Sequence, residues 1–266
     1  MFGSYVAPFV KKAVGGITIL KASSNKISES YEFLAAFFAG FGSCLFFHYV
    51  MPFNFENVLI ASLIVILPGL SVTIAMNELA SQNLVSGTAR LMGSMIGLLK
   101  IAFGIFLAVQ LNKLLFIDIV NPVAPVMSPW LIIPAMTITS ITFTIIFNAK
   151  KTDYIWVLVS GIVSFGTLKL SSLIFNDVLS VFLAAFTIGV FSNIVARIRN
   201  KPSLITLLPG IIFLVPGSVG IKGLNLIFEH NLIAGIDGSI KMFILSITIV
   251  TGLLIASIFV SPRKGL

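Results

Sequence analysis

Two Pro-Gly pairs interrupt apolar stretches of this sequence, Pro68-Gly69 and Pro216-Gly217. Proline removes a backbone donor and clashes with the preceding helical turn, and glycine tolerates the unwound backbone that follows. A helix interrupted in this way presents N–H groups and a partial positive charge at the start of its second piece. A helix start of this kind can bind the carboxylate of a small zwitterionic solute. We therefore expect the two pairs to mark a ligand site.

Polar side chains follow both pairs at short spacing. Ser71, Thr73 and Asn77 come after the first pair, and Ser218 and Asn225 come after the second. They could cap the interrupted helices, contact a ligand or join neighbouring helices by hydrogen bonds. The simpler alternative, that each pair is a packing kink, is common for a single interruption. Two matched interruptions favour a site lined by these five residues and the Pro-Gly pairs.

Three charged residues lie in or near apolar stretches. Glu78 is the only acid that follows Pro68-Gly69 in the first interrupted stretch, and the second has none before Glu229. Glu78 is the leading candidate to attract an ammonium group or to carry a coupling proton, and its alternative role is to mark the membrane interface. Lys100 is costly in mid-membrane unless it faces water or a partner. Arg90 fits an anchor on the inner side.

The sequence lacks the residue patterns typical of disulfides, metal sites and catalytic sites. Cys44 is the single cysteine, so the chain has no internal disulfide and no cysteine-based metal site. His48 and His230 have no acidic or cysteine cluster beside them in the sequence, and no catalytic pair or metal motif appears. We expect no enzyme activity, no metal and no cofactor. The net charge of +8 is spread over short loops, which argues against nucleic-acid binding.

The composition requires a membrane. Apolar residues make up 58% of the 266 positions, charged residues only 10%, and the mean hydropathy is +1.10, whereas soluble domains carry about 25% charge. The apolar runs are long and continuous, which favours helices over a barrel. We predict an all-α integral membrane protein of about eight spans, near residues 32–50, 55–79, 90–111, 128–147, 155–175, 178–196, 203–228 and 240–260.

The sequence repeats itself at an offset of 148–149 residues. Residues 68–87 align without a gap with residues 216–235, and the segment FLAAF occurs at 33–37 and again at 182–186. The Pro-Gly pairs fall in the second and seventh predicted spans, an odd number apart, so the chain would cross in opposite directions in the two copies. We predict two inverted repeats, residues 1–120 (shortened) and 121–266, as in secondary transporters. Pro209-Gly210 predicts a second interruption in the later copy only.

The same segments resemble a known family. ILPGLSVTIAMNELASQNLVSGTARL at 66–91 and PGIIFLVPGSVGIKGL at 209–224 are similar to the motifs of the threonine/serine exporter family, in which a Pro-Gly precedes an acidic helix and a G-x-A-R turn. The resemblance covers residues from about 30 to 260. It implies proton-coupled export of small hydroxy amino acids. Family members usually have ten spans, and the usual N-terminal part is missing from the pattern here; the family's aspartate is replaced by Glu78.

The expected partners follow from this reading. They are membrane lipid, a small amino acid and protons, with a second copy or a partner chain as the source of missing helices. The alternatives left open are a channel for small solutes and a membrane subunit that does not itself transport. We expect the protein in the cell or plasma membrane.

Orientation follows from the basic residues. Of the 17 Lys and Arg residues, twelve fall in segments on one side of the predicted spans, and Lys113, Lys222 and Lys241 fall on the other. Because basic residues concentrate in cytoplasmic loops, both termini should be cytoplasmic. A reporter that is active only in the cytoplasm should be active when fused to either end of the chain. An impermeant reagent added from outside should label a cysteine placed at Asp177. A C-terminus on the outer side would contradict this topology and, with it, the inverted repeat.

Overall fold

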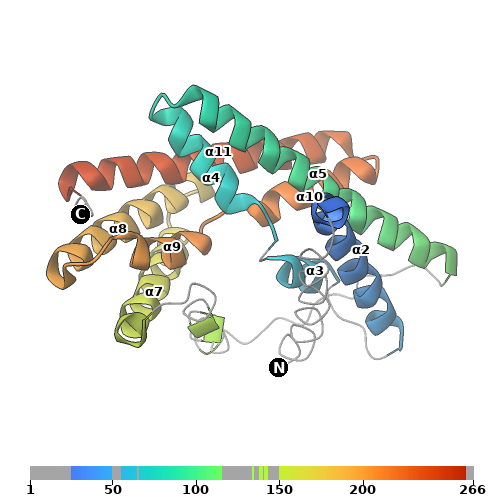
Figure 1. Cartoon of the computed structure of the whole chain (residues 1–266), viewed down its shortest axis with the longest axis horizontal. Coiled ribbons are helices and arrows are strands. Elements are labelled where there is room, and N and C mark those ends of the chain that lie inside the picture. Colours follow the sequence, from blue (N-terminus) through green and yellow to red (C-terminus); the bar gives the residue numbers. More distant parts are fainter. Residues whose placement is uncertain are drawn as a thin grey trace. The chain divides into compact units, whose positions relative to one another are not determined.

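The computed structural model describes residues 25–49, 55–64, 66–115, 134, 138–139, 141–142 and 150–261, and every regular element among them is helical. Figure 1 shows these elements along the chain. They are α2 (Asn25–Tyr49), α3 (Phe55–Leu63), α4 (Gly69–Ala80), α5 (Leu84–Leu115), the short 3-10 helix η2 (Lys151–Asp153), α7 (Tyr154–Ser171), α8 (Asp177–Arg199), α9 (Leu204–Ile212), α10 (Gly217–Phe228) and α11 (Leu232–Phe259).

Six stretches of the described chain are long and apolar enough to cross a membrane, which confirms the helical membrane class. They are Ser30–Tyr49, Leu84–Leu115, Tyr154–Ser171, Asp177–Arg199, Leu204–Phe228 and Leu232–Phe259. The predicted span at 55–79 is divided between α3 and α4. The predicted span at 128–147 lies almost wholly outside the described residues. The third and last spans begin earlier than expected, at Leu84 and Leu232.

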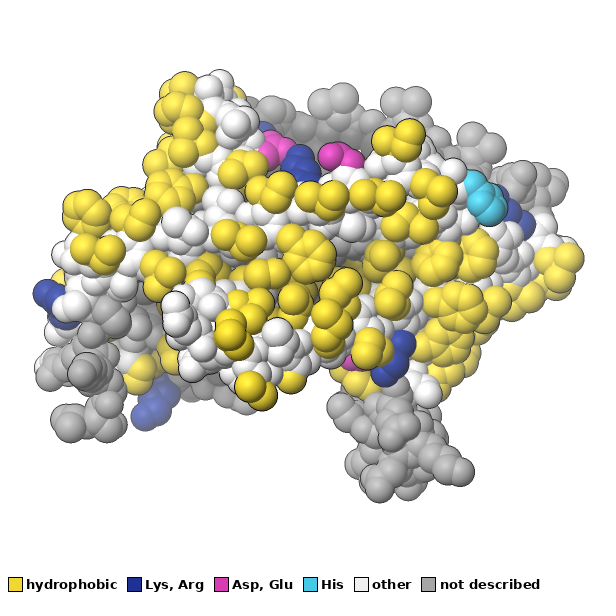
Figure 2. Space-filling view, turned by 90° about the horizontal axis from the view of Figure 1, so that it is seen from above, with side chains coloured by type: hydrophobic (Ala, Val, Ile, Leu, Met, Phe, Trp, Pro, Cys, Tyr) yellow, Lys and Arg dark blue, Asp and Glu magenta, His cyan; other side chains and the backbone are white. Residues whose placement is uncertain are grey.

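The exposed side chains of these helices are largely apolar. Ile155, Leu170, Ile233 and Ile258 are among the large hydrophobic residues that are at least two-thirds exposed. Figure 2 shows hydrophobic side chains spread over the face it presents, with few charged ones between them. A water-soluble protein rarely exposes so much apolar surface, whereas a surface that faces lipid is apolar.

The chain folds into two compact units, each built from separate segments. Unit 1 draws its described residues from Met1–Val72, Thr88–Val126 and Gly217–Met242, and unit 2 draws them from Thr73–Gly87, Met127–Pro216 and Phe243–Leu266. Unit 1 therefore combines α2, α3 and α5 with α10, which comes from much later in the sequence. Unit 2 contains α7, α8 and α9, which pack against one another and lie side by side in Figure 1.

In unit 1, α2 packs against α5 through glycine. A methyl group on Gly104 would lie 2.6 Å from the carbonyl oxygen of Phe33 and 3.1 Å from the amide nitrogen of Phe37. A methyl group on Gly40 would lie 2.9 Å from the Cβ atom of Ala108. The contacting residue numbers rise together, so the two helices run in the same direction. Small residues allow this close approach, on which helix association in lipid depends.

Unit 2 contains the same packing between α8 and α11. A methyl group on Gly252 would lie 2.9 Å from the carbonyl oxygen of Phe182 and 3.0 Å from the amide nitrogen of Phe186. A methyl group on Gly189 would lie 2.7 Å from the Cβ atom of Ala256. Each of these residues follows its counterpart in unit 1 by 148 or 149 positions. The sequence repeat thus corresponds to a repeated helix contact.

This packing gives a stability prediction on α5. Gly104→Ala should lower stability by about 1–3 kcal/mol, because the new methyl group meets the backbone of α2. Gly93→Ala on the same helix is the matched control, since nothing lies within 4 Å of a methyl group there, and alanine favours helix by up to about 1 kcal/mol. Thermal unfolding in detergent measures both. Equal midpoints for the two variants would show that α2 and α5 do not approach this closely.

Candidate functional site

Each of the two aligned Pro-Gly pairs stands between two helices. α3 ends at Leu63 and α4 begins at Gly69, whereas α9 ends at Ile212 and α10 begins at Gly217. The helix before each pair ends in a similar way. The amide of Ile66 donates to the carbonyl of Leu63 at 2.8 Å, and the amide of Leu214 donates to the carbonyl of Ile211 at 2.7 Å. In both copies a new helix of 12 residues starts at the glycine.

The two glycines meet inside unit 1. A methyl group on Gly217 would lie 3.3 Å from the Cα atom of Gly69, 3.5 Å from its amide nitrogen and 3.4 Å from the Cβ atom of Leu67. Both glycines are buried. The starts of α4 and α10 therefore approach each other backbone to backbone, at a distance that leaves little room for a side chain. Since a helix start carries a partial positive charge, their meeting point favours an anion or a polar ligand group.

The far ends of α4 and α10 are also alike. Gln82 and His230 both take the left-handed conformation, with φ of 62° and 65°. The amide of Asn83 donates to the carbonyl of Glu78 at 2.9 Å, and the amide of Asn231 donates to that of Leu226 at 2.9 Å. These left-handed turns with a bond back across the helix end are a common way to stop a helix. They fix where α5 and α11 begin.

The Pro209-Gly210 prediction is wrong. Pro209 lies inside α9, in its last turn, and the helix continues to Ile212. Gly210 instead serves close packing: a methyl group on it would collide with Cγ1 of Ile188 on α8, and its carbonyl accepts a hydrogen bond of 2.7 Å from Ser164 Oγ on α7. Proline at 209 removes the single hydrogen bond that its amide would donate to the carbonyl of Ile205, but the helical backbone continues to Ile212.

The predicted site residues divide between the two units. Unit 1 holds Pro68, Gly69, Ser71, Arg90, Lys100, Gly217, Ser218 and Asn225, and unit 2 holds Thr73, Asn77, Glu78 and Pro216. Thr73 is buried, Ser71, Ser218 and Glu78 are half-buried, and Asn77 and Arg90 are exposed. The structure thus brings together the two helix starts in unit 1. The repeat-related asparagines differ, because Asn77 faces outward and the Oδ1 atom of Asn225 is buried.

Lys100 has an acidic partner that the sequence did not indicate. Its Nζ atom lies 3.6 Å from Oε2 of Glu32 on α2. A methyl group on Gly97, one turn earlier on α5, would lie 3.3 Å from Oε1 of the same carboxylate. The glycine makes room for Glu32 beside α5, and the opposite charges lower the cost of placing each in an apolar helix. An acid in the first turns of a predicted span was the signal for it.

Buried polar atoms mark further candidates that spacing did not single out. The Oδ1 atoms of Asn112 and Asn225 and the Oγ atom of Ser43, all in unit 1, are buried and have no hydrogen-bond partner among the described residues. The Oγ atom of Ser192 in unit 2 is in the same state. A buried polar atom left unsatisfied costs about 1–3 kcal/mol. Such atoms are therefore sites where water or a ligand group is expected to bind.

Comparison with known proteins bears on the whole chain. The model of the threonine/serine exporter family ThrE matches residues 5–112. A second model, ThrE_2, also described as a threonine/serine exporter, matches residues 133–259. The interrupted helices α4 and α10 lie one in each match.

Three yeast proteins are similar, each named pheromone-regulated membrane protein 10. The one from Zygosaccharomyces rouxii is 27% identical over 97% of this chain and 29% of its own length. The one from Kluyveromyces lactis is 27% identical over 93% of this chain and 29% of its length. The one from Saccharomyces cerevisiae strain S288c is 28% identical over 84% and 62% respectively. The chain thus spans less than two-thirds of the length of these relatives.

No solved structure matches the chain. The two family matches carry the assignment, and they agree with a helical chain whose exposed surface is apolar. The chain belongs to the threonine/serine exporter family, a family of membrane transporters.

Proposed function

We propose that this protein is a secondary transporter that exports small amino acids such as threonine and serine in exchange for protons. The observation that carries the proposal is the meeting of two helix starts, where Gly217 contacts Gly69 within unit 1. Helix starts that meet within a membrane are suited to hold a carboxylate through backbone N–H groups. Family membership supports the same substrate class.

The architecture that we propose is a pair of inverted repeats, residues 1–120 and 121–266, with both termini in the cytoplasm. Three features support it: the repeated helix contacts, the equal length of α4 and α10, and two family matches that fall on either side of residue 120. Related halves of opposite direction allow a site to open to each side of the membrane in turn. Pro68 and Pro216 are included in the proposed site because each comes directly before the glycine at which a helix starts.

We assign roles in the site by residue type. The helix starts at Gly69 and Gly217 bind the carboxylate of the substrate. Ser71 and Ser218, each two residues or fewer into its helix, add hydroxyl groups, and Asn225 adds a buried amide oxygen that can accept from an ammonium or hydroxyl group. Thr73 and Asn77, further along α4, are assigned to polar contacts with the substrate as it passes along that helix. Arg90 and Lys100 are assigned to the charge balance of the site. Lys100 contributes through its ion pair with Glu32.

Glu78 is assigned to proton coupling rather than to direct contact with the carboxylate. It lies nine residues beyond Gly69 on the same helix, which is roughly 14 Å along the axis at 1.5 Å per residue. A half-buried carboxyl group on a membrane helix can take up and release a proton as the surroundings change. The structure that we propose therefore separates the substrate group from the coupling group along one helix.

The decisive variant is Glu78→Gln, which keeps the side-chain shape and removes the proton-binding site. Export of labelled threonine from loaded vesicles should lose its response to a pH gradient, by at least about tenfold if Glu78 carries the coupled proton. Glu229→Gln is the matched control, because Glu229 is an exposed acid after α10 and the charge change is the same.

The outcomes separate the alternatives. Gradient-driven export by Glu78→Gln at the rate of the unchanged protein would remove Glu78 from the coupling role. Unsaturable flux accompanied by current would indicate a channel instead of a coupled transporter. Absence of any threonine or serine flux from the purified, folded chain would contradict the proposed function itself.

A further inference from the structure

A shallow hollow in unit 2 lies where α7 begins and α8 ends. Charged side chains (Asp153, Arg199 and Lys201) and apolar ones (Trp156, Val195 and Ile205) line it together. Asp153 precedes the first residue of α7, and Arg199 is the last residue of α8. Because α7 and α8 are both candidate spans, the hollow lies at the boundary between membrane and water.

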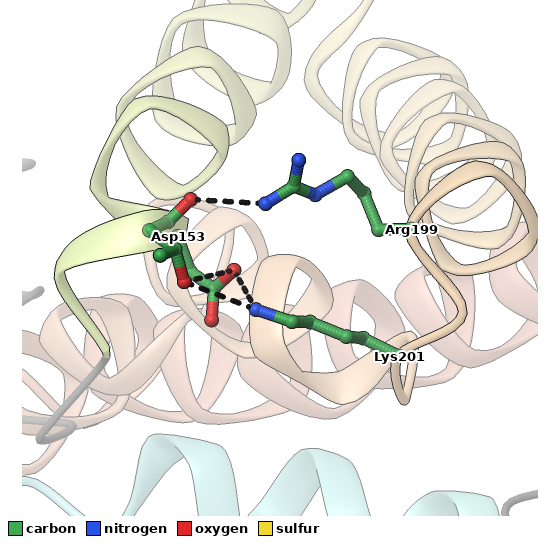
Figure 3. Close-up of polar contacts among 4 residues, drawn as sticks. Asp153, Arg199 and Lys201 are labelled. Atoms are coloured by element: carbon green, nitrogen blue, oxygen red, sulfur yellow. Dashed lines mark hydrogen bonds and ion pairs between the residues drawn. The ribbon is translucent and has the colours of Figure 1, made fainter.

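The polar side of the hollow is built around one buried carboxylate. Asp153 is 3% exposed and forms an ion pair with Lys201, whose ammonium also donates to Thr152 Oγ1 at 3.2 Å. Arg199 donates from Nη2 to the backbone carbonyl of Thr152 at 3.4 Å. Figure 3 shows Arg199 and Lys201 reaching the start of α7 from the same side.

The charges do not balance. Asp153 compensates Lys201, and no carboxylate in the described part of the chain pairs with Arg199. A guanidinium has five N–H donors in a planar fork, and the hydrogen bonds of the described residues use one donor group of Arg199. The hollow therefore keeps one net positive charge and several N–H donors, which suit a phosphate group.

The apolar side of the hollow carries residues suited to a lipid boundary. Tyr154 and Trp156 stand in the first turn of α7, the position that amphipathic aromatic residues prefer at the membrane boundary. Ile155 and Ile198, next to the hollow in sequence, are 73% and 67% exposed. A free phosphate ion would gain nothing from an indole and aliphatic wall, whereas the glycerol and first methylene groups of a lipid would pack against it.

We infer that this hollow binds the headgroup phosphate of an anionic membrane lipid, held by Arg199 and covered on its apolar side by Trp156. A phosphatidylglycerol carries the negative charge that the hollow lacks. A phosphatidylcholine brings its own cation, which meets Arg199 and Lys201 at short range. The site therefore selects anionic lipid, as basic clusters at the membrane surface do. It is independent of the transport site.

Arg197 provides an internal control for this inference. It lies two residues before Arg199 at the same end of α8, but it donates to the backbone carbonyl of Ser261 at 3.0 Å and to Ser261 Oγ at 2.8 Å. Its charge lies outside the lining of the hollow. Removing Arg197 changes the net charge as much as removing Arg199 and leaves the hollow intact.

Trp156 reports on the lipid directly. The sequence has two tryptophans, so Trp130→Phe leaves Trp156 as the single tryptophan, whose emission is excited selectively at wavelengths that tyrosine does not absorb. The protein is placed in phosphatidylcholine nanodiscs with increasing fractions of brominated phosphatidylglycerol or brominated phosphatidylcholine. The anionic lipid should quench Trp156 at about fivefold lower fraction, the effect of one basic side chain at a membrane surface. Arg199→Gln should abolish the difference, and Arg197→Gln should retain it.

Each other result overturns the inference. Equal quenching by the two lipids in the otherwise unchanged protein would exclude a selective headgroup site, whether or not Arg199→Gln folds. Equal loss of preference in the Arg197 and Arg199 variants would reduce the effect to general surface charge. Relief of quenching by inorganic phosphate at constant ionic strength would identify a soluble anion, not a lipid, as the occupant.

Discussion

Direct contact between helix backbones through glycine is the interaction on which both units of this protein depend. Lipid solvates leucine as well as another helix does, so apolar side chains alone give helices no reason to associate. Gly104 and Gly252 bring a whole helix against the backbone of another, at distances where a single methyl group would collide. The same contact occurs in both units at residues 148 to 149 positions apart, so one packing solution is used twice.

The contact between Gly69 and Gly217 is the same kind of close approach, made at a different place in the helix. At α2 and α5 the glycine stands within a continuous helix and holds two spans together. At α4 and α10 it stands at the first residue of a helix, so the close approach brings together two helix starts instead of two helix sides. Polar atoms without partners among the described residues, such as Asn225 Oδ1, lie in the same unit. These are the atoms that the ligand of the proposed site would satisfy.

Much of this arrangement was predictable, because it depends on residues with few conformational choices. Proline and glycine fix where α4 and α10 begin, and long apolar runs fix the class of fold. The rest depended on tertiary contacts that spacing does not encode. Pro209 resembles Pro216 in sequence, yet its neighbour Gly210 is required for contact with Ile188 and the helix continues. Glu32 lies at the edge of a predicted span, where an acidic residue is ordinary. Only the packing of α2 against α5 shows that it pairs with Lys100. Asn77 and Asn225 align in the repeat but differ in burial, since Asn77 is exposed and the Oδ1 atom of Asn225 is buried.

A reversible cross-link between the two helix starts tests the central claim most directly. In a background with Cys44→Ala, cysteines replace Leu67 and Gly217. The Cβ atom of Leu67 lies 3.4 Å from a Cβ atom on residue 217, close to the roughly 3.8 Å of a disulfide. Oxidation should join the two cysteines and lower threonine export below that of the same variant in its reduced state, and a reductant should reverse this loss. Failure of the disulfide to form would contradict the contact, and export that continues with the disulfide in place would contradict its role in transport.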